Sequence, residues 1–326
     1  MGVQSTKPAA QWFACRVLAI VAPGQGSQKP GMLIPWLENP AHDAALAAYS
    51  ESVGLDLKYL GTEATADEIK DTSVTQPLVV ASALLAASAL DIPAGTVIAG
   101  HSVGELAAAA IAGVFPDEVA VTLAGIRGAE MAKACALTPT SMAAVLGGDA
   151  EIVASRLAEL DLVGANVNGG GQVVAAGSLT GIEELLATPP AGARAMPLSV
   201  AGAFHTAYMA PAREALAEHA ARRQPADPTR TLLTNSDGSV VESGQTYLDL
   251  LVSQVTSPVR WDLCMATFKA MGVTGVLELP PAGALVGLVK RELKGVGGEK
   301  GTATFALKSP EDLDAAAAFI AEHSGA

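Results

Sequence analysis

Cysteine and aromatic residues are scarce in this chain of 326 residues. Cysteine occurs only at Cys15, Cys135 and Cys264, without a C-x-x-C pair, so neither a disulfide framework nor a zinc or other metal site is expected. Unpaired thiols are typical of a cytoplasmic protein. Aromatic residues make up 4% of the chain although half of it is hydrophobic, so alanine, valine, leucine and glycine must fill the core. This composition favours helices packed closely on a sheet, as in α/β enzymes.

Basic residues are also in deficit, with 20 lysines and arginines against 33 acidic residues and a formal net charge of −13. Nucleic acid and anionic membrane both attract a basic surface, so neither is expected as a partner. No hydrophobic run reaches the length of a membrane span, and Arg16 interrupts the run at 12–20, so we expect no signal peptide or anchor. We expect residues 1–15 to form a disordered leader.

Short apolar runs alternate with helix-like segments along the chain. The runs at 17–22, 96–100 and 273–279 carry almost no charge, which is typical of buried parallel strands. The segments 75–90 and 117–137 have the length and the starting residues of helices. Strands that alternate with helices predict an α/β fold with a mostly parallel sheet covered by helices on both faces.

The pattern changes from residue 139. Strand, helix, strand, strand, helix and strand follow one another up to residue 199, which is the βαββαβ order of a ferredoxin-like unit. We therefore expect a small inserted ferredoxin-like subdomain at 139–199 in a large hydrolase-like catalytic domain formed by 16–138 and 200–326.

A Gly-His-Ser-Val-Gly sequence at 100–104 follows a predicted strand and precedes an alanine-rich helix. This is the G-x-S-x-G pattern of a nucleophile elbow, in which Gly100 and Gly104 let strand and helix pass closely and Ser102 stands exposed at the apex. The Val103 amide, at the start of the helix, could donate to an oxyanion formed beside the serine. The alternative is a chance match in a chain rich in glycine and alanine.

Two of the five histidines are candidates for a general base. His42, His219 and His323 lie in polar helical stretches and are expected to be solvated. His101 precedes the elbow serine and should point away from it, so it supports the turn rather than accepting the proton. His205 lies in a loop of small residues where the chain re-enters the large domain, and it is our candidate base. A structural loop histidine is the alternative.

Arg127 is unusual because it lies among small residues inside a predicted helix. Gly125 and Gly128 flank it, and a glycine in a helix interior costs about 1 kcal/mol relative to alanine, so we expect another group to approach closely. A guanidinium in such a groove could bind a carboxylate with two hydrogen bonds. The alternative is an ion pair with Glu130, three residues further along the helix.

A glycine-rich loop at 23–28 follows the first predicted strand. It lacks the dinucleotide and Walker patterns, so a phosphate site is poorly supported. We expect it to bring backbone amides and Gln25 to the carboxyl end of the strand, unless it is a plain turn.

An elbow serine and a downstream histidine together indicate acyl transfer through an acyl-enzyme. An α/β-hydrolase would have an acid between them, but no acidic residue stands out here.

From about residue 17 to 320 the chain resembles the malonyl-CoA:acyl carrier protein transacylases of bacterial fatty acid and polyketide synthesis. The matching segments are Pro-Gly-Gln25-Gly-Ser-Gln, Gln76-Pro77, Gly-His101-Ser102-Val-Gly-Glu105, Arg127, Asn166-Val-Asn168 with Gln172-Val-Val-Ala-Ala-Gly177, Gly-Ala-Phe204-His205, and Gln254 with Pro258-Val-Arg-Trp261.

The resemblance implies that Ser102 carries the malonyl ester and that His205 activates it, oriented by a backbone carbonyl near Gln254 in place of a carboxylate. It implies that Arg127 binds the malonyl carboxylate. Backbone amides of Gln25 and Val103 would form the oxyanion hole, and the further residues of the substrate site would be Gln76, His101, Asn168, Phe204 and Gln254. Phe204 would disfavour an α-methyl group on the substrate, with some transfer of methylmalonyl still expected.

The implied reaction transfers a malonyl group from malonyl-CoA to the phosphopantetheine thiol of acyl carrier protein by a ping-pong route. Coenzyme A thioester is a substrate, no cofactor is bound permanently, and a monomer is expected. The acidic carrier would need a local basic surface, for which we suggest Lys290, Arg291, Lys294 and Lys308. The alternatives are a serine esterase or thioesterase with the same Ser-His dyad, a trans-acting polyketide acyltransferase, and a carrier-binding protein without catalysis.

Overall fold

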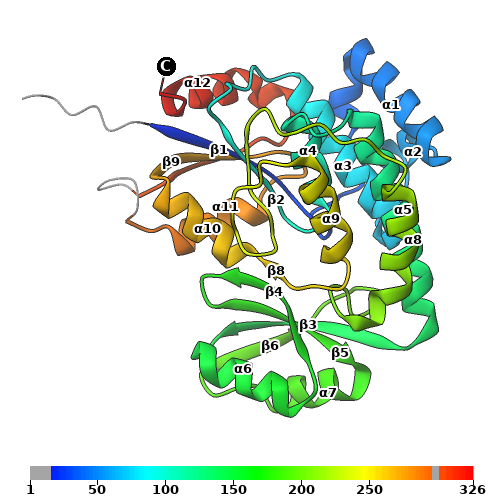
Figure 1. Cartoon of the computed structure of the whole chain (residues 1–326), viewed down its shortest axis with the longest axis vertical. Coiled ribbons are helices and arrows are strands. Elements are labelled where there is room, and N and C mark those ends of the chain that lie inside the picture. The colour runs from blue at the N-terminus through cyan, green and yellow to red at the C-terminus, as the bar shows by residue number, and fades with distance from the viewer. Residues whose placement is uncertain (1–15, 296–300, 326) are drawn as a thin grey trace, which may run out of the picture.

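The computed structural model describes residues 16–295 and 301–325 (Figure 1). The leader predicted at 1–15 lies outside the described residues. A five-stranded parallel sheet with its helices forms the larger part of the molecule. A second five-stranded sheet, with two helices on its outer side, lies below it in Figure 1. This arrangement confirms the predicted fold class.

The large sheet is parallel throughout its described strand pairs. In the order in which they lie across the sheet, its strands are β10 (Ala303–Ala306), β9 (Val273–Glu278), β1 (Val17–Ala22), β2 (Val97–Gly100) and β7 (Thr231–Leu232). The register pairs Ala22 with Gly100 at the carboxyl ends of β1 and β2. The glycine-rich loop after β1 and the elbow after β2 therefore leave the sheet side by side, at the edge where parallel α/β sheets place their sites.

Alternate side chains of β1 enter two separate cores. Leu18 and Ile20 face the larger core, whereas Ala19 and Val21 face the smaller one. The helices that share the larger core include α3 (Thr72–Ser88), α4 (Gly104–Ile111), α5 (Asp117–Leu137) and α12 (Leu313–His323). Those on the other face are α10 (Trp261–Ala270) and α11 (Ala284–Glu292). The strand is thus buried on both sides, which accounts for its charge-free sequence.

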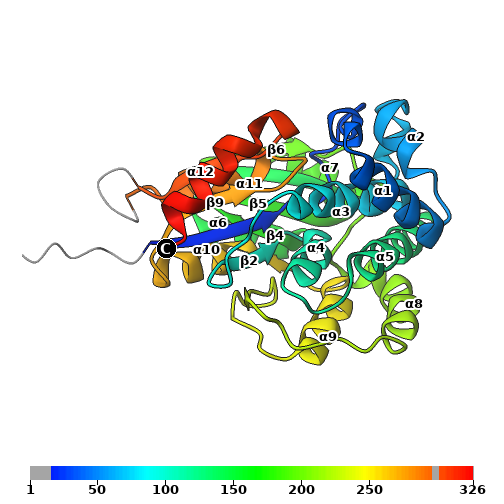
Figure 2. The same ribbon diagram turned by 90° about the horizontal axis from the view of Figure 1, so that it is seen from above.

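The remaining helical segments include both α-helices and short 3-10 turns (η). Those of the larger part are η1 (Ile34–Glu38), α1 (Pro40–Val53), α2 (Leu57–Thr62), η2 (Glu68–Lys70), η3 (Ala207–Met209), α8 (Ala210–Ala220), α9 (Gly244–Gln254) and η4 (Pro310–Asp312). Figure 2 shows α1, α3 and α5 packed side by side.

Helix α3 begins earlier than its sequence predicts. Pro77 favoured a start at residue 75, but the Asp71 carboxylate accepts a hydrogen bond from the Ser73 N–H at 2.8 Å and caps a helix that starts at Thr72. Gln76 therefore lies one turn inside a helix that packs directly against α5.

The glycines beside Arg127 are explained by neighbouring helices. A Cβ added at Gly128 would lie 2.6 Å from the carbonyl oxygen of Thr72 in α3, and one at Gly125 would lie 2.9 Å from Val53 in α1. The predicted close approach is therefore present, but the groups that approach are helices rather than a substrate. Tight packing of α3 against α5 places Arg127 beside Gln76.

The second sheet has the predicted βαββαβ order. Its strands lie in the order β6 (Ala193–Pro197), β3 (Thr140–Gly147), β5 (Gln172–Ser178), β4 (Val163–Gly169) and β8 (Val259–Arg260), with α6 (Ala150–Glu159) and α7 (Leu179–Ala187) connecting them. The first four lie in the chain order fourth, first, third, second, as in ferredoxin-like sheets, and β8 adds from the large part, parallel to β4. The boundaries at 139–199, 16–138 and 200–326 remain predictions.

Two of the histidines expected in solvent are buried, so that expectation was wrong for them. His42 is 6% exposed because helical spacing places it on the same face of α1 as Leu46, and its Nδ1 lies 3.0 Å from the Trp36 carbonyl oxygen. His323 is likewise buried on the inner face of α12, with its Nδ1 2.9 Å from Thr274 Oγ1. Polar neighbours in the sequence do not reveal which face of a helix a histidine occupies.

Candidate active site

Ser102 lies at the sharp turn between β2 and α4, with a positive φ of 53° that non-glycine residues rarely adopt. A Cβ added at Gly100 would lie 2.1 Å from the backbone of Gly104, and one at Gly104 would lie 2.3 Å from the carbonyl oxygen of Ala22. Both glycines are therefore required for strand and helix to pass so closely. The turn has the geometry that the G-x-S-x-G pattern predicts.

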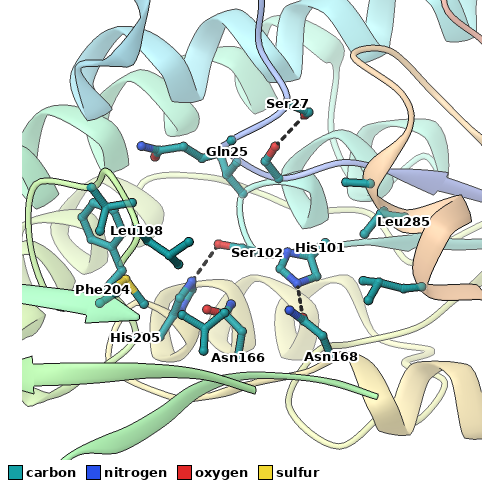
Figure 3. A pocket seen from close by; sticks show the side chains of 18 of the residues that line it. Gln25, Ser27, His101, Ser102, Asn166, Asn168, Leu198, Phe204, His205 and Leu285 are labelled. Atoms are coloured by element: carbon teal, nitrogen blue, oxygen red, sulfur yellow. Dashed lines mark hydrogen bonds between the residues drawn. The ribbon is translucent and has the colours of Figure 1, made fainter. Parts of the chain in front are cut away.

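His205 faces the serine directly (Figure 3), with 2.7 Å between its Nε2 and Ser102 Oγ. Its Nδ1 lies 2.8 Å from the backbone carbonyl oxygen of Gln254. Because a carbonyl can only accept, Nδ1 carries the proton of the neutral ring and Nε2 is left to accept from the serine hydroxyl. A carbonyl thus orients the ring where a triad would use a carboxylate.

Arg127 is buried beside the serine, and three groups accept from its guanidinium. Its Nη1 donates to Gln76 Oε1 at 2.6 Å, and its Nη2 donates to Gln254 Oε1 at 2.9 Å and to Ser102 Oγ at 3.3 Å. All of these acceptors are neutral. The two glutamine side chains hold the guanidinium plane at the serine without neutralising its charge.

The ion pair considered between Arg127 and Glu130 does not form. Glu130 instead pairs with Lys133 at 2.7 Å on the surface of α5. Burial lowers the pKa of Arg127 to about 10, and the nearby charge of Glu105 partly opposes this effect. Arg127 therefore stays charged at neutral pH, and within the described residues it has no ion-pair partner.

The charge of Arg127 also acts on His205. Burial first, and then the positive charge of Arg127, lower the pKa of His205 to about 3, while the hydrogen bond to Gln254 opposes the shift. The ring is consequently neutral at physiological pH, as a general base must be before it accepts a proton.

These side chains line a cavity of about 510 Å³ beside the elbow. Its walls come from the loop after β1, the elbow, α5, the ferredoxin-like sheet, the segment before His205 and α11. The predicted site residues that line it are Gln25, Gln76, His101, Ser102, Val103, Arg127, Asn168, Phe204 and His205. Gln254 lies behind Arg127 rather than in the wall, so it would act on a ligand through the guanidinium.

The two proposed oxyanion donors, Gln25 in the loop after β1 and Val103 in the elbow, both line the cavity. Within the described part of the chain, the backbone N–H groups of Gln25 and Val103 donate to no other residue. The Gln25 side chain points elsewhere, because its Nε2 donates to Thr72 Oγ1 at 3.3 Å. Any contribution of Gln25 to an oxyanion must therefore come from its main chain.

His101 points away from the serine, as expected for the residue before an elbow apex. Its Nε2 lies 2.9 Å from Asn168 Oδ1 (Figure 3), and its ring packs edge-on against Trp261 with 5.6 Å between ring centroids. The contact joins the elbow to β4 of the second sheet. The roles of His101 and Asn168 in substrate binding remain predictions.

Sequence reasoning gave no role to two residues that hold the elbow, Asn235 and Glu105. The Ser102 N–H donates to Asn235 Oδ1 at 2.8 Å, and Asn235 Nδ2 donates to the Gly100 carbonyl at 2.7 Å. The Asn235 N–H in turn donates to Glu105 Oε1 at 2.6 Å. Glu105 directly follows the elbow glycine, which was a usable signal. Nothing in the sequence connects Asn235 with a turn 133 residues earlier.

Across residues 16–295 and 301–325, no three histidine, cysteine or acidic side chains come together as a metal site. No helix in these ranges has the length and hydrophobicity needed to cross a membrane.

Comparison with known proteins agrees with this geometry. The acyl transferase domain family matches residues 20–318. The malonyl CoA-acyl carrier protein transacylase of Mycobacterium tuberculosis strain H37Rv is 55% identical over 303 residues, which are 91% of this chain and 98% of that protein. The crystal structure of the M. tuberculosis enzyme has 54% identity and a TM-score of 0.88, covering 92% of this chain and 99% of that one.

A more distant structure contains a partner. It is a complex of a type II PKS acyl-carrier protein with its malonyl-transacylase, with 30% identity and a TM-score of 0.84, covering 93% of this chain and 99% of that one. Family match, sequence identity and structural similarity all extend over nearly the whole described fold. The chain therefore belongs to the acyl transferase domain family, within the group that includes the malonyl CoA-acyl carrier protein transacylases.

Proposed function

We propose that this protein transfers the malonyl group of malonyl-CoA to the phosphopantetheine thiol of an acyl carrier protein. The observation that carries the proposal is the charged, buried Arg127, whose Nη2 lies 3.3 Å from Ser102 Oγ and whose partners are all neutral. An acyl group on Ser102 that ended in a carboxylate would supply the missing anion. Relatives named as transacylases favour transfer over the esterase and thioesterase alternatives.

The first half-reaction loads the serine. Ser102 Oγ attacks the thioester carbonyl carbon while its proton passes to His205 Nε2, and the resulting oxyanion accepts from the N–H groups of Gln25 and Val103. The C–S bond then breaks, the sulfur of coenzyme A takes the proton from His205, and malonyl-Ser102 remains. Arg127 holds the malonyl carboxylate throughout.

The second half-reaction runs the same steps in reverse order with a different thiol. His205 accepts the proton of the phosphopantetheine thiol, the sulfur attacks the ester of malonyl-Ser102, and the serine oxygen regains its proton as it leaves. The proposed site is the same for both thiols, so no further catalytic residue is needed.

Labelled malonyl-CoA tests the proposal. Incubated alone with the protein, it should leave label on Ser102 that persists in water, and phosphopantetheinylated carrier protein added afterwards should take that label onto its thiol. Release of free malonate before any thiol is added would identify a hydrolase and contradict the proposal.

The lowered pKa of His205 predicts the pH dependence of serine acylation. Acetyl-CoA is the suitable probe, because its acyl group carries no titratable carboxylate. With an ordinary histidine pKa of about 6.5, the neutral fraction would fall about 25-fold between neutral pH and about pH 5. A His205 pKa of about 3 leaves the base neutral over this range, so kcat/KM for acylation should change less than about twofold. A fall centred near pH 6.5 would contradict the assigned environment of His205.

We propose that the carrier docks on the basic surface formed by Lys290, Arg291, Lys294 and Lys308. All four side chains are exposed, and Arg291 also lines the cavity. Lys290 and Arg291 occupy the last turn of α11, and Arg291 places its charge at the wall of the cavity.

Reversing the charges of Lys290 and Arg291 should raise the KM for the carrier about tenfold at low salt and reduce its salt dependence, because acidic partners are attracted by complementary charge. The KM for malonyl-CoA is the internal reference. A matched reversal of Lys58 and Lys70, on α2 and η2 away from α11 in Figures 1 and 2, should change the carrier KM little. An unchanged carrier KM in the first variant would place the docking surface elsewhere.

We also propose that the protein is cytoplasmic, which agrees with the free thiols of Cys135 and Cys264. A monomeric state stays a prediction.

A further inference from the structure

The Gln254 side chain lies between a buried cation and a buried acid. Its Oε1 accepts from Arg127 at 2.9 Å, and its Nε2 donates to the Ser102 carbonyl at 3.1 Å and to Glu105 Oε2. The two ends of an amide have almost the same shape but opposite hydrogen-bonding character. With the amide turned over, the NH₂ group would face the Arg127 guanidinium and neither could accept from the other.

Glu105 is placed to prevent that rotation. Its side chain, in the first turn of α4, is 1% exposed. Oε1 accepts from the Asn235 N–H at 2.6 Å and from the Tyr247 hydroxyl at 3.4 Å, while Oε2 accepts from Gln254. Every described hydrogen-bond partner of this carboxylate is a donor. A carboxylate can accept at both oxygens, whereas an amide in its place could accept at only one.

We propose that Glu105 is a positioning residue for the malonyl substrate. Its carboxylate fixes the orientation of the Gln254 amide, and through that amide it holds the Arg127 guanidinium where the malonyl carboxylate binds. Glu105 does not line the cavity and would touch no substrate atom. The inference rests on the proposed function, because it concerns the same carboxylate receptor.

Glutamine at position 105 would create a conflict between two donors. Its single carbonyl oxygen could satisfy either Asn235 or Gln254, and its NH₂ group would face the other. The Asn235 donor is a main-chain N–H that cannot turn, whereas the Gln254 side chain can. The conflict therefore falls on Gln254 and loosens its hold on Arg127.

Comparison of Glu105→Gln with Glu105→Asp tests the proposal. The readout is the ratio of kcat/KM for acylation of Ser102 by malonyl-CoA to that by acetyl-CoA. Losing one charged hydrogen bond at Arg127 should lower this ratio about 10-fold to 100-fold in Glu105→Gln. Burial raises the pKa of Glu105 to about 7, so the assay is run at least about one unit above that value.

Glu105→Asp should preserve the ratio better than Glu105→Gln, because aspartate still accepts at both oxygens. A small cavity of about 20 Å³, whose lining includes Glu105, Thr234 and Ser253, adjoins the carboxylate, and a water there can span the shortened side chain. Glutamine is the closer match in shape to glutamate, so a purely structural role would rank the two variants the other way. That opposite ranking would overturn the proposal.

Two further variants separate positioning from general loosening of the fold. Tyr247→Phe removes another donor to Glu105 without touching Gln254, and it should leave the ratio within about twofold of the unmodified protein. In a Gln254→Leu background, which keeps the backbone carbonyl for His205, neither change at Glu105 should lower the ratio further. A further fall in that background would overturn the proposal.

Thermal unfolding is measured for each variant. If Glu105→Gln does not fold, Glu105→Asp is compared in the otherwise unmodified protein and in Gln254→Leu. The smaller fall in the malonyl-to-acetyl ratio that Glu105→Asp causes in the first must then be absent in the second. Malonyl loading by the unmodified protein tests the proposed function separately from the positioning role. If the unmodified protein does not load malonyl on Ser102, the proposed function is refuted. Malonyl loading with a ratio insensitive to Glu105 refutes only the positioning role.

Discussion

Replacing Ser102 with alanine is expected to abolish the malonyl-enzyme and to lower malonyl transfer to the carrier by roughly 10,000-fold or more. Alanine has no Oγ, so the 2.7 Å contact with His205 Nε2 disappears together with the atom that carries the ester. The Ser102 N–H bond to Asn235 uses only the main chain and survives the change. Intact-protein mass spectrometry after incubation with malonyl-CoA measures the loss directly.

Ser27 provides a matched control, because it also lines the cavity and, among the described residues, its hydroxyl bonds only to the Gly24 carbonyl at 3.3 Å. Ser27→Ala should load malonyl at close to the normal rate. Unchanged thermal unfolding of Ser102→Ala would show that the loss is chemical. A malonyl adduct that still forms on Ser102→Ala would require a different nucleophile and would refute the assigned mechanism.

Replacing Arg127 with alanine is expected to lower kcat/KM for malonyl loading by about 100-fold to 5,000-fold, because an uncompensated buried carboxylate is costly by about 3 to 5 kcal/mol. Acetyl loading should change far less, since an acetyl group has no carboxylate to pair. The ratio of the two specificity constants is the informative measurement. If Arg127 only stabilised the fold, its replacement would lower the specificity constants for malonyl and acetyl loading together.

Lys133→Ala, on the surface of the same helix, is the control for loss of a positive charge from α5. It should leave the malonyl-to-acetyl ratio unchanged. Arg127→Lys keeps the charge but not the planar pair of donors that Gln76 and Gln254 orient, so its ratio should lie between those of the unmodified protein and Arg127→Ala. A strong malonyl preference retained by Arg127→Ala would refute its role as the carboxylate receptor.

Features encoded by adjacent residues were predictable from the sequence. The elbow is defined by five consecutive residues, and the closest contacts of Gly100 and Gly104 are made within that turn and with the adjoining strand. The charge-free run of β1 similarly reflects burial on both faces of one strand. Each of these predictions needed only the local alternation or spacing of residue types.

Features that depend on helix faces or distant contacts were not predictable in the same way. The sequence suggested that Gly125 and Gly128 make room for another group, but only the packing of α1 and α3 identifies that group. His42 was misplaced because its buried neighbours lie one turn away rather than next to it. The hydrogen bond between the Ser102 N–H and Asn235 joins residues that are 133 positions apart in the sequence.

The orientation of His205 is intermediate between these cases. The sequence showed that no acid accompanied the histidine, and the family resemblance indicated a carbonyl near Gln254. The 2.8 Å contact between His205 Nδ1 and the Gln254 carbonyl supplies the geometry that neither could give. Gln254 is the last residue of α9, where the helix supplies no full set of main-chain donors, and its carbonyl accepts from Ser257 N–H at 3.1 Å as well as from His205.

The most direct test of malonyl transfer is competition for the serine. The unmodified protein is incubated with equal concentrations of malonyl-CoA and acetyl-CoA and quenched, and the adduct on the peptide containing Ser102 is identified by mass spectrometry. We predict that malonyl occupies Ser102 in large excess over acetyl. Equal loading of the two acyl groups, or an adduct on any residue other than Ser102, would contradict the proposed function.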